Sequence, residues 1–361
     1  MIYAPFLVVT LCRYDLFKRC LESLSANPYA KHTPVYVALD YPFKDEHWDG
    51  YNKIKDFLRG DFNFKELNII KRTTNFGPAD NFNDAVEQVF SKYDRVITSE
   101  DDVEFSPNFL EYIDKGLEKF ENDDDIYAIC GFGLPTVCFK SEKFIPCGQN
   151  NFLKMGTFYN PWGVGVWKNK YLQVLEVCKT EQCFPTYLFD RNPFVLLKYP
   201  KILVYFTEIL LANYGFVIDQ HIKCYLFSNG KKVILPIVTK TKNLGIYSLE
   251  GITSPGTNVY EKYQYYQNLD KEMSFDFVED ENNSSVSKKY ESMLHSTYNK
   301  PPPTSKKYIF KCVIKYIFIR VFGLKFARKL WKFEHPYSSS GFAKMRSAYL
   351  TQKSQKEGEN A

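Results

Sequence analysis

Short apolar runs alternate with amphipathic stretches over the first 130 residues of the chain. Runs of the length of a strand occupy 6–12, 35–39, 67–70, 95–98 and 126–130. Helical patterns lie between them, at 16–24, 51–58 and 79–90. A further helix is expected from about Pro107, with Ser106 as its N-cap. Strands that alternate with helices in this way predict an α/β fold, with a mostly parallel central sheet flanked by helices.

Polar side chains directly follow three of the predicted strands. Arg13 comes after the first strand, Asp40 after the second, and the acidic triplet Glu100-Asp101-Asp102 after the fourth. In parallel sheets, ligands bind beyond the carboxyl ends of the strands. We therefore expect these residues to converge on one cleft.

The pattern changes twice along the rest of the chain. It is irregular from 131 to about 260, with Gly, Pro, Trp and Asn concentrated at 160–167. The stretch 270–305 is polar and contains three consecutive prolines, a composition typical of a linker. We expect a domain over 1–265, a linker over 266–305 and a helical tail over 306–361.

The net charge of +5 is too small for a dedicated nucleic-acid-binding protein, and 45% hydrophobic residues exclude a disordered chain. The charge is unevenly distributed. Residues 306–333 carry nine cations and no acids, whereas the rest of the chain has a net charge of −4, with 38 basic against 42 acidic residues. A basic, aromatic-rich helix of this kind is typical of attachment to an anionic membrane surface. The alternative is a helix packed on the domain with solvated lysines.

Two stripes run along this predicted helix: cations at Lys307, Lys311 and Lys315, and apolar residues at Ile309, Val313 and Ile317. The N-terminal apolar run lacks a basic segment and is too short to span a bilayer. The nine cysteines include no CxxC pair, which favours a reducing compartment. We expect a cytoplasmic protein, peripheral on the inner face of the cell membrane.

The acidic triplet is the strongest candidate for chemistry. Three adjacent carboxylates repel one another and raise one another's pKa, and a divalent cation relieves this repulsion. Mg²⁺ or Mn²⁺ prefers one or two carboxylates together with phosphate oxygens. The triplet at 100–102 is thus a candidate metal–diphosphate site. Alternatively, it is an acidic cluster before a helix N-terminus, and the similar triplet at 123–125 is interpreted as a solvated loop.

The segment 96–112, VITSEDDVEFSPNFLEY, resembles the metal-site segment of N-acetylglucosaminyltransferase I and its bacterial, family 2-like relatives. These are inverting glycosyltransferases with the GT-A fold. Weaker similarity extends over about 5–256 and includes the first strand and helix, Asp40, and the helix at 81–90. The resemblance implies a GT-A fold with a C-terminal helical extension.

The resemblance also implies roles for individual residues. Asp102 would be the metal ligand, supported by Asp101, and Glu100 would face the donor sugar. Arg13 and Asp40 would contact the nucleotide. Asn81 is the matching position for a further donor contact, where eukaryotic members have His.

Further site residues follow from the second half of the chain. Asp219 matches the family's catalytic Asp and would be the general base. His221 is an alternative base. The structural alternative is that Asp219 only caps a helix or forms an ion pair. In the loop at 240–256, the resemblance assigns diphosphate contacts to Gly251, Thr253 and Ser254; a surface turn is the alternative. Trp162 is a candidate floor for a sugar ring, or a core residue.

Two departures affect these assignments: Gln220 replaces a second Asp, and the stretch 253–255 carries an extra residue. The leading hypothesis is an inverting, metal-dependent glycosyltransferase. It would move a sugar from a nucleotide-diphosphate donor, a UDP-sugar, to a saccharide or lipid-linked glycan, as in surface-polysaccharide synthesis. The alternatives are a sugar nucleotidyltransferase, disfavoured because no glycine follows the first strand, and a catalytically silent membrane-peripheral binding protein.

Overall fold

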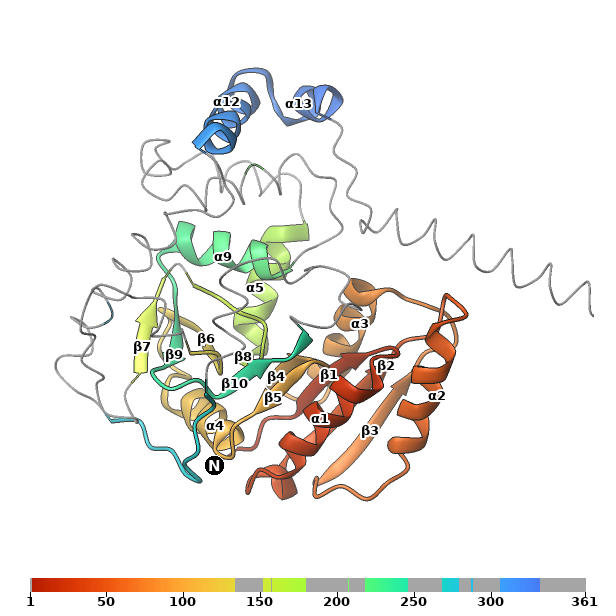
Figure 1. The fold of residues 1–361 in the computed structure, drawn as a ribbon. Coiled ribbons are helices and arrows are strands. Elements are labelled where there is room, and N and C mark those ends of the chain that lie inside the picture. Colours follow the sequence, from red (N-terminus) through yellow and green to blue (C-terminus); the bar gives the residue numbers. More distant parts are fainter. Residues whose placement is uncertain are drawn as a thin grey trace, which may run out of the picture.

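The computed structural model describes 2–133, 152–156, 158–179, 207, 218–245, 268–278, 287 and 306–331. Within these residues an eight-stranded sheet has the order β3-β2-β1-β4-β8-β6-β9-β7. Its first four neighbours are parallel: β3 (Glu66–Lys71), β2 (Pro34–Leu39), β1 (Phe6–Thr10) and β4 (Arg95–Glu100). The mostly parallel sheet predicted from the apolar runs is confirmed (Figure 1).

The other half of the sheet is mixed. β8 (Val164–Trp167) lies between β4 and β6 (Ile126–Cys130) and is antiparallel to both. β9 (Lys232–Pro236) is parallel to β6, and β7 (Phe152–Met155) closes the sheet as an antiparallel edge strand. The irregular region of the sequence therefore contributes strands to the same sheet as the N-terminal half.

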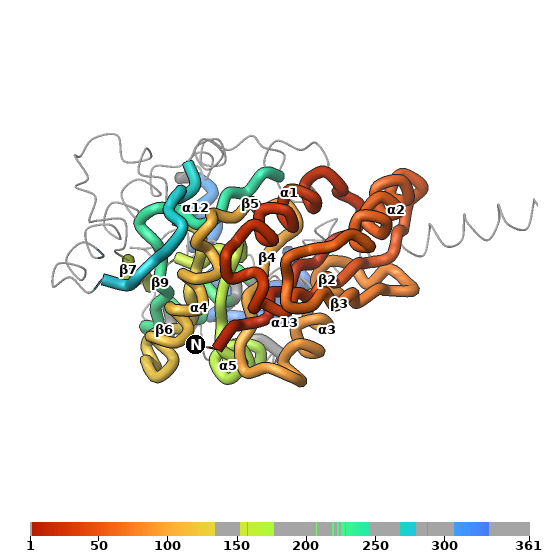
Figure 2. The backbone as a smooth tube through the Cα atoms, turned by 90° about the horizontal axis from the view of Figure 1, so that it is seen from below, coloured from red at the N-terminus to blue at the C-terminus, as the bar shows by residue number. Residues whose placement is uncertain are grey.

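Helices cover both faces of this sheet. α1 (Tyr14–Ser25), α2 (His47–Phe57) and α4 (Phe109–Lys119) pack into one apolar cluster, and α3 (Pro78–Phe90), α5 (Lys168–Lys179) and α9 (Ile218–Asn229) pack into another. Figure 2 shows the strands between α1 and α2 on one side and α3 and α5 on the other. The helices pack in this way because each has one apolar face. In α1, for example, that face buries Phe17, Cys20, Leu21 and Leu24.

The start of α4 differs from the prediction. The helix begins at Phe109, not Pro107, and Asn108 occupies the N-cap position. Ser106 does not cap the helix; its hydroxyl donates a hydrogen bond to Asn108 Oδ1 (2.9 Å), and Asn108 Nδ2 donates to Asp270 Oδ2 (3.1 Å). The side chains of Ser106 and Asn108 therefore bond to each other and to Asp270, about 160 residues further along the chain, instead of capping the helix.

A small second sheet pairs β5 (Val103–Phe105) with β10 (Thr241–Asn243) in antiparallel register. β5 directly follows the acidic triplet, and Asn243 lies opposite Val103. This pairing brings the chain after residue 240 to the carboxyl end of β4.

The predicted C-terminal helical extension is present as α12 (Lys306–Phe322) and α13 (Leu324–Leu330). Both lie beyond α9 at the top of Figure 1. No helix among the described residues combines the length and apolar character needed to cross a bilayer.

Candidate active site

The acidic triplet lies where the first and fourth strands end side by side. Glu100 is the last residue of β4 and pairs in register with Val9 of β1. Asp101 and Asp102 follow in a turn, and both are buried. Thr10, at the end of β1, donates its hydroxyl to Asp101 Oδ2 (2.8 Å). The parallel pairing of these two strands thus fixes the position of the acids.

Arg13 neutralises two of these carboxylates. Its Nη1 donates to Asp102 Oδ2 (2.9 Å), and its Nη2 forms an ion pair with Asp101 Oδ1. Burial alone would lower the pKa of Arg13, but the charges of Asp101 and Asp102 raise the pKa above its ordinary value. The sequence prediction that Arg13 and the acids converge is therefore confirmed.

Asp102 is held on its other side by the end of β10 and the two residues that follow it. Asn243 Nδ2 donates to Asp102 Oδ1 (3.0 Å), and the backbone N–H of Leu244 donates to the carbonyl of Asp102 (2.7 Å). A Cβ atom at Gly245 would lie 2.0 Å from Asp102 Oδ2, so only glycine permits this approach. Burial raises the pKa of Asp102, against the lowering effect of Arg13.

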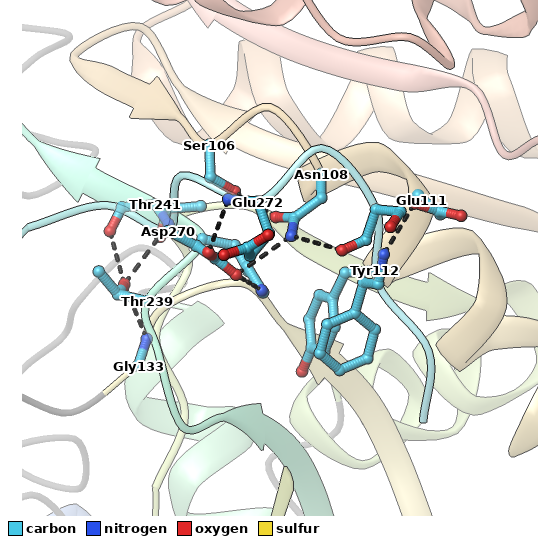
Figure 3. Close-up of polar contacts among 12 residues, drawn as sticks. Ser106, Asn108, Glu111, Tyr112, Gly133, Thr239, Thr241, Asp270 and Glu272 are labelled. Carbon is cyan, nitrogen blue, oxygen red and sulfur yellow. Dashed lines mark hydrogen bonds and ion pairs between the residues drawn. The ribbon is translucent and has the colours of Figure 1, made fainter. Parts of the chain in front are cut away.

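A buried polar cluster anchors the same segment (Figure 3). Lys240 is fully buried and forms an ion pair with Asp270, which is itself 4% exposed. Burial lowers the pKa of Lys240. Thr239 Oγ1 accepts from the backbone N–H of Gly133 (2.9 Å) and donates to the carbonyl of Thr241 (2.7 Å). These contacts fix the chain that presents Asn243 to the acids.

Glu100 faces the second half of the sheet. Trp162 Nε1 donates to Glu100 Oε2 (3.1 Å), and the Trp162 ring packs edge-on against Phe132 with centroids 5.2 Å apart. Burial, with the charges of Asp102 and other acids, raises the pKa of Glu100 to about 8. Trp162 is partly buried and contacts both apolar clusters, which is compatible with the core alternative for this residue as well as with a sugar floor.

Asp219 lies in the first turn of α9. Its Oδ2 forms an ion pair with Lys223 Nζ (3.1 Å), and its side chain is 27% exposed. The Asp219 charge contributes to the raised pKa of Glu100, after burial, Asp102 and Asp101. Asp219 therefore belongs to the surroundings of the acidic triplet, and the ion pair matches the structural alternative considered for it.

Asp40 anchors a loop. Its carboxylate accepts hydrogen bonds from the backbone N–H groups of Tyr41 (2.8 Å), Phe76 (2.8 Å) and Gly77 (2.9 Å), and from Asn75 Nδ2 (3.1 Å). These four donors fill the acceptor sites of a carboxylate. Burial raises the pKa of Asp40 even so. A nucleotide contact for Asp40 stays a prediction.

Asn81 is 1% exposed and its side chain is engaged on both sides. Its Oδ1 accepts from Arg72 Nε (2.8 Å), and its Nδ2 donates to the carbonyl of Ala38 (3.0 Å). Arg72 also pairs with Asp84 (2.6 Å) and lies over the Phe76 ring. The donor contact predicted for Asn81 likewise stays a prediction.

The residues at the acidic triplet fit a divalent cation. Among the described residues no group of three His, Cys, Asp or Glu side chains forms a metal site by itself. Mg²⁺ and Mn²⁺ need only one or two carboxylates when a substrate supplies phosphate oxygens. Asp102 and Asp101 already face a positive charge, that of Arg13. Their carboxylate oxygens are the hard ligands that such a cation takes.

Residues 6–163 match the model of the glycosyl transferase family 2. The match covers somewhat less than half of the chain, and it shows what this N-terminal part is similar to. With the sheet described above, this confirms the predicted GT-A fold. The more specific resemblance to N-acetylglucosaminyltransferase I stays a prediction. A search of curated proteins found no match.

Several solved structures are similar to this chain at low sequence identity. S. aureus TarS 1–349 in complex with UDP-GlcNAc is 11% identical at a TM-score of 0.39, over 96% of this chain and 92% of that one. A mannosyltransferase from Pyrobaculum calidifontis, in complex with GDP-Man and Mn²⁺, is 10% identical at 0.37, over 91% and 83%. A longer S. aureus TarS structure is 15% identical at 0.31, over 49% of this chain, and the match spans only 30% of that protein. All three TM-scores are below 0.5.

Three predicted site residues, Gly251, Thr253 and Ser254, lie outside the described residues. The side chains of His221 and Gln220 are not described either. Conversely, sequence reasoning missed Asn243 and Gly245, although both lie within the loop it singled out. The available signal was the Lys-Asn-x-Gly sequence at 242–245. It could not identify Asp102 as the partner of Asn243 and Gly245, because Asp102 is about 140 residues away in the sequence.

Proposed function

We propose that this protein is an inverting glycosyltransferase that uses a nucleotide-diphosphate sugar, a UDP-sugar, as donor. The acceptor is a hydroxyl of a saccharide or of a lipid-linked glycan. One observation carries the proposal: Arg13, Asp101 and Asp102 form a compact charged cluster at the carboxyl ends of two adjacent parallel strands. That is the position at which nucleotide ligands bind in such sheets.

Asp102 would hold Mn²⁺ or Mg²⁺, with Asp101 beside it. When bound, the metal supplies Lewis-acid neutralisation of the donor diphosphate as the nucleoside diphosphate leaves. The guanidinium of Arg13 suits a phosphate group because its planar fork can donate two parallel hydrogen bonds. We assign Arg13 to the donor nucleotide, and Gly251, Thr253 and Ser254 to the diphosphate through backbone and hydroxyl contacts.

Glu100 and Trp162 would border the donor sugar. With a pKa of about 8, Glu100 is largely protonated at neutral pH and can donate a hydrogen bond to a sugar hydroxyl. Its proton also reduces repulsion among the three acids. The hydrogen bond from Trp162 Nε1 fixes its carboxyl group, so the two side chains would act together on sugar specificity.

Asp219 would remove the proton from the acceptor hydroxyl during attack on the anomeric carbon. Its carboxylate is partly exposed, so an acceptor can reach it, and Lys223 holds it from the same face of α9. Asp40 and Asn81 would act on the nucleotide through the 75–77 loop and Arg72, which their side chains fix.

The proposal is tested by donor binding. Full-length protein is titrated by calorimetry with UDP-GlcNAc, UDP-glucose and GDP-mannose, each with and without Mn²⁺. We expect Mn²⁺-dependent binding of a UDP-sugar that Asp102→Asn abolishes. Asp219→Asn should keep donor binding and lose transfer. The matched control is Asp124→Asn, in the exposed triplet at 123–125, which should change neither.

Two results contradict the proposal. If wild type and Asp102→Asn bind the donor with equal affinity, Asp102 does not hold a metal ion that donor binding needs. Donor binding that is tight without any divalent cation would point instead to a metal-independent transferase. A preference for GDP-mannose over both UDP-sugars would correct the nucleotide.

A further inference from the structure

α12 presents two opposite apolar faces. Cys312, Tyr316 and Ile319 are buried on one side of the helix. Four other large apolar residues point away from it: Phe310, Ile314, Ile317 and Val321 are 63%, 48%, 53% and 66% exposed. At 100° per residue the centre of the second set is turned about 160° from the centre of the first, so the exposed residues form a continuous outward stripe. A solvated helix face would carry polar residues there.

α13 extends the same surface. Phe322, Phe326 and Leu330 are all at least half exposed. The rings of Phe318, Phe322 and Phe326 contact one another, with Phe318 stacked on Phe326, and Trp331 packs edge-on against Phe318 with centroids 4.9 Å apart. Gly323, with φ of 82°, permits the turn between the helices. We call the exposed apolar residues of α12 and α13 together the tail surface.

Cations flank this surface and no acid interrupts it. Residues 306–331 contain eight Lys and Arg and no Asp or Glu. Lys307 and Lys311 lie on one side of the outward stripe and Arg320 on the other, while Lys325 and Lys329 are exposed on α13. Long basic side chains beside an apolar stripe can reach phosphate groups while their neighbours enter an apolar layer.

We propose that the tail surface binds the interfacial region of an anionic lipid bilayer. Its apolar stripe would enter the boundary between headgroups and acyl chains, and its cations would contact lipid phosphates. The charge decides between this occupant and a second copy of the chain. Two identical surfaces that carry only positive charge repel each other, whereas an anionic headgroup layer complements them.

Membrane attachment through the tail surface would also place the proposed active site relative to the bilayer, and this step rests on the proposed function. In Figure 1, α9, which carries Asp219, lies between the sheet and α12. A bilayer on the tail surface would therefore lie on the same side of the sheet as the proposed base. That placement suits an acceptor presented at a membrane, and the binding itself does not depend on the proposed reaction.

Co-sedimentation of the full chain with vesicles tests the proposal. Vesicles of neutral phosphatidylcholine are compared with vesicles that contain about 30% of the anionic lipid phosphatidylglycerol. We expect binding only to the anionic vesicles, and weaker binding at higher salt. Lys307→Gln/Lys311→Gln should weaken vesicle affinity about 30-fold, at roughly fivefold per cation. Ile314→Ser/Ile317→Ser should weaken it by roughly tenfold or more.

The control replaces matched residues on the edge strand β3, far from α12 in Figure 1. Ile69 is 46% exposed there, between the exposed Lys65 and Lys71, so Ile69→Ser and Lys65→Gln/Lys71→Gln remove similar groups. These variants should bind vesicles as wild type does. Calorimetric UDP-sugar binding, unchanged in every variant, separates this proposal from the catalytic one.

Three outcomes overturn the inference. The first is that wild type stays in the supernatant with anionic vesicles. The second is that the α12 variants sediment like the β3 controls. The third is a concentration-dependent dimer in light scattering that Ile314→Ser/Ile317→Ser abolishes while vesicles bind nothing; the tail surface would then join two copies of the chain.

Discussion

Replacing Arg13 by Gln should destabilise the empty protein and make it depend on a divalent cation. Asp101 and Asp102 are 4% and 5% exposed, and the Arg13 side chain is 23% exposed. Removing one partner of a buried ion pair costs about 3–5 kcal/mol, because the remaining charge loses its compensation. Since Arg13 retains some contact with solvent, we expect the lower end, about 3 kcal/mol. For a domain of this size that lowers Tm by about 6–12 °C.

The assay is thermal unfolding at pH 7 with and without Mn²⁺. In wild type, Mn²⁺ alone should change Tm little, because it competes with the Arg13 guanidinium for the same oxygens. In Arg13→Gln, Mn²⁺ should recover much of the lost stability by replacing the missing cation. Calorimetry should give tighter binding of Mn²⁺ alone to the variant, and weaker binding of the UDP-sugar.

The matched control is Arg59→Gln. Arg59 pairs with Asp56 at 2.8 Å, but the two side chains are 74% and 68% exposed. Such a pair contributes only about 0–1 kcal/mol. The reasoning is refuted if Arg13→Gln is as stable as Arg59→Gln, or if Mn²⁺ stabilises wild type and Arg13→Gln equally.

Three further predictions concern single buried groups, two of them in the segment that contacts Asp102 and one on α4. Gly245→Ala places a Cβ 2.0 Å from Asp102 Oδ2 and should cost about 100-fold in kcat/KM. Lys240→Met should lower the free energy of unfolding by about 3–5 kcal/mol in urea titrations, and adding Asp270→Leu should restore part of it. Burial raises the pKa of Asp114 from 3.8 to about 7, so the folded state binds the extra proton. Stability should therefore fall by about 3 kcal/mol as pH rises from 4 to 7, and Asp114→Asn should remove this dependence.

Much of the parallel half of the fold could be predicted from the sequence because its signals are local. Five apolar runs became β1, β2, β3, β4 and β6, with bounds within two residues of the prediction. The insertion of β8 between β4 and β6 could not be predicted in the same way. Its pairing with Arg95–Thr98 joins residues about 70 positions apart, and nothing in the local pattern of 164–167 specifies an antiparallel partner.

The site residues likewise fall into those that local sequence signals predict and those that depend on distant pairing. Arg13 and the acidic triplet could be placed together because both follow strands of one parallel sheet. Asn243 and Gly245 could not, since their importance depends on the β5–β10 pairing. The helical tail shows a related limit. Its period predicted a helix, but the inward residues are Cys312, Tyr316 and Ile319, while Ile317 of the predicted apolar stripe points outward.

The charges around Asp102 explain how the site can be stable when empty and still accept a cation. Asp101 and Asp102 contribute two negative charges against the single positive charge of Arg13. Glu100, with its pKa of about 8, adds little negative charge at neutral pH. One unit of negative charge is thus left over, which limits repulsion in the folded protein but still attracts a divalent cation. A donor diphosphate brings its own negative charge, so metal and nucleotide should bind more tightly together than either does alone.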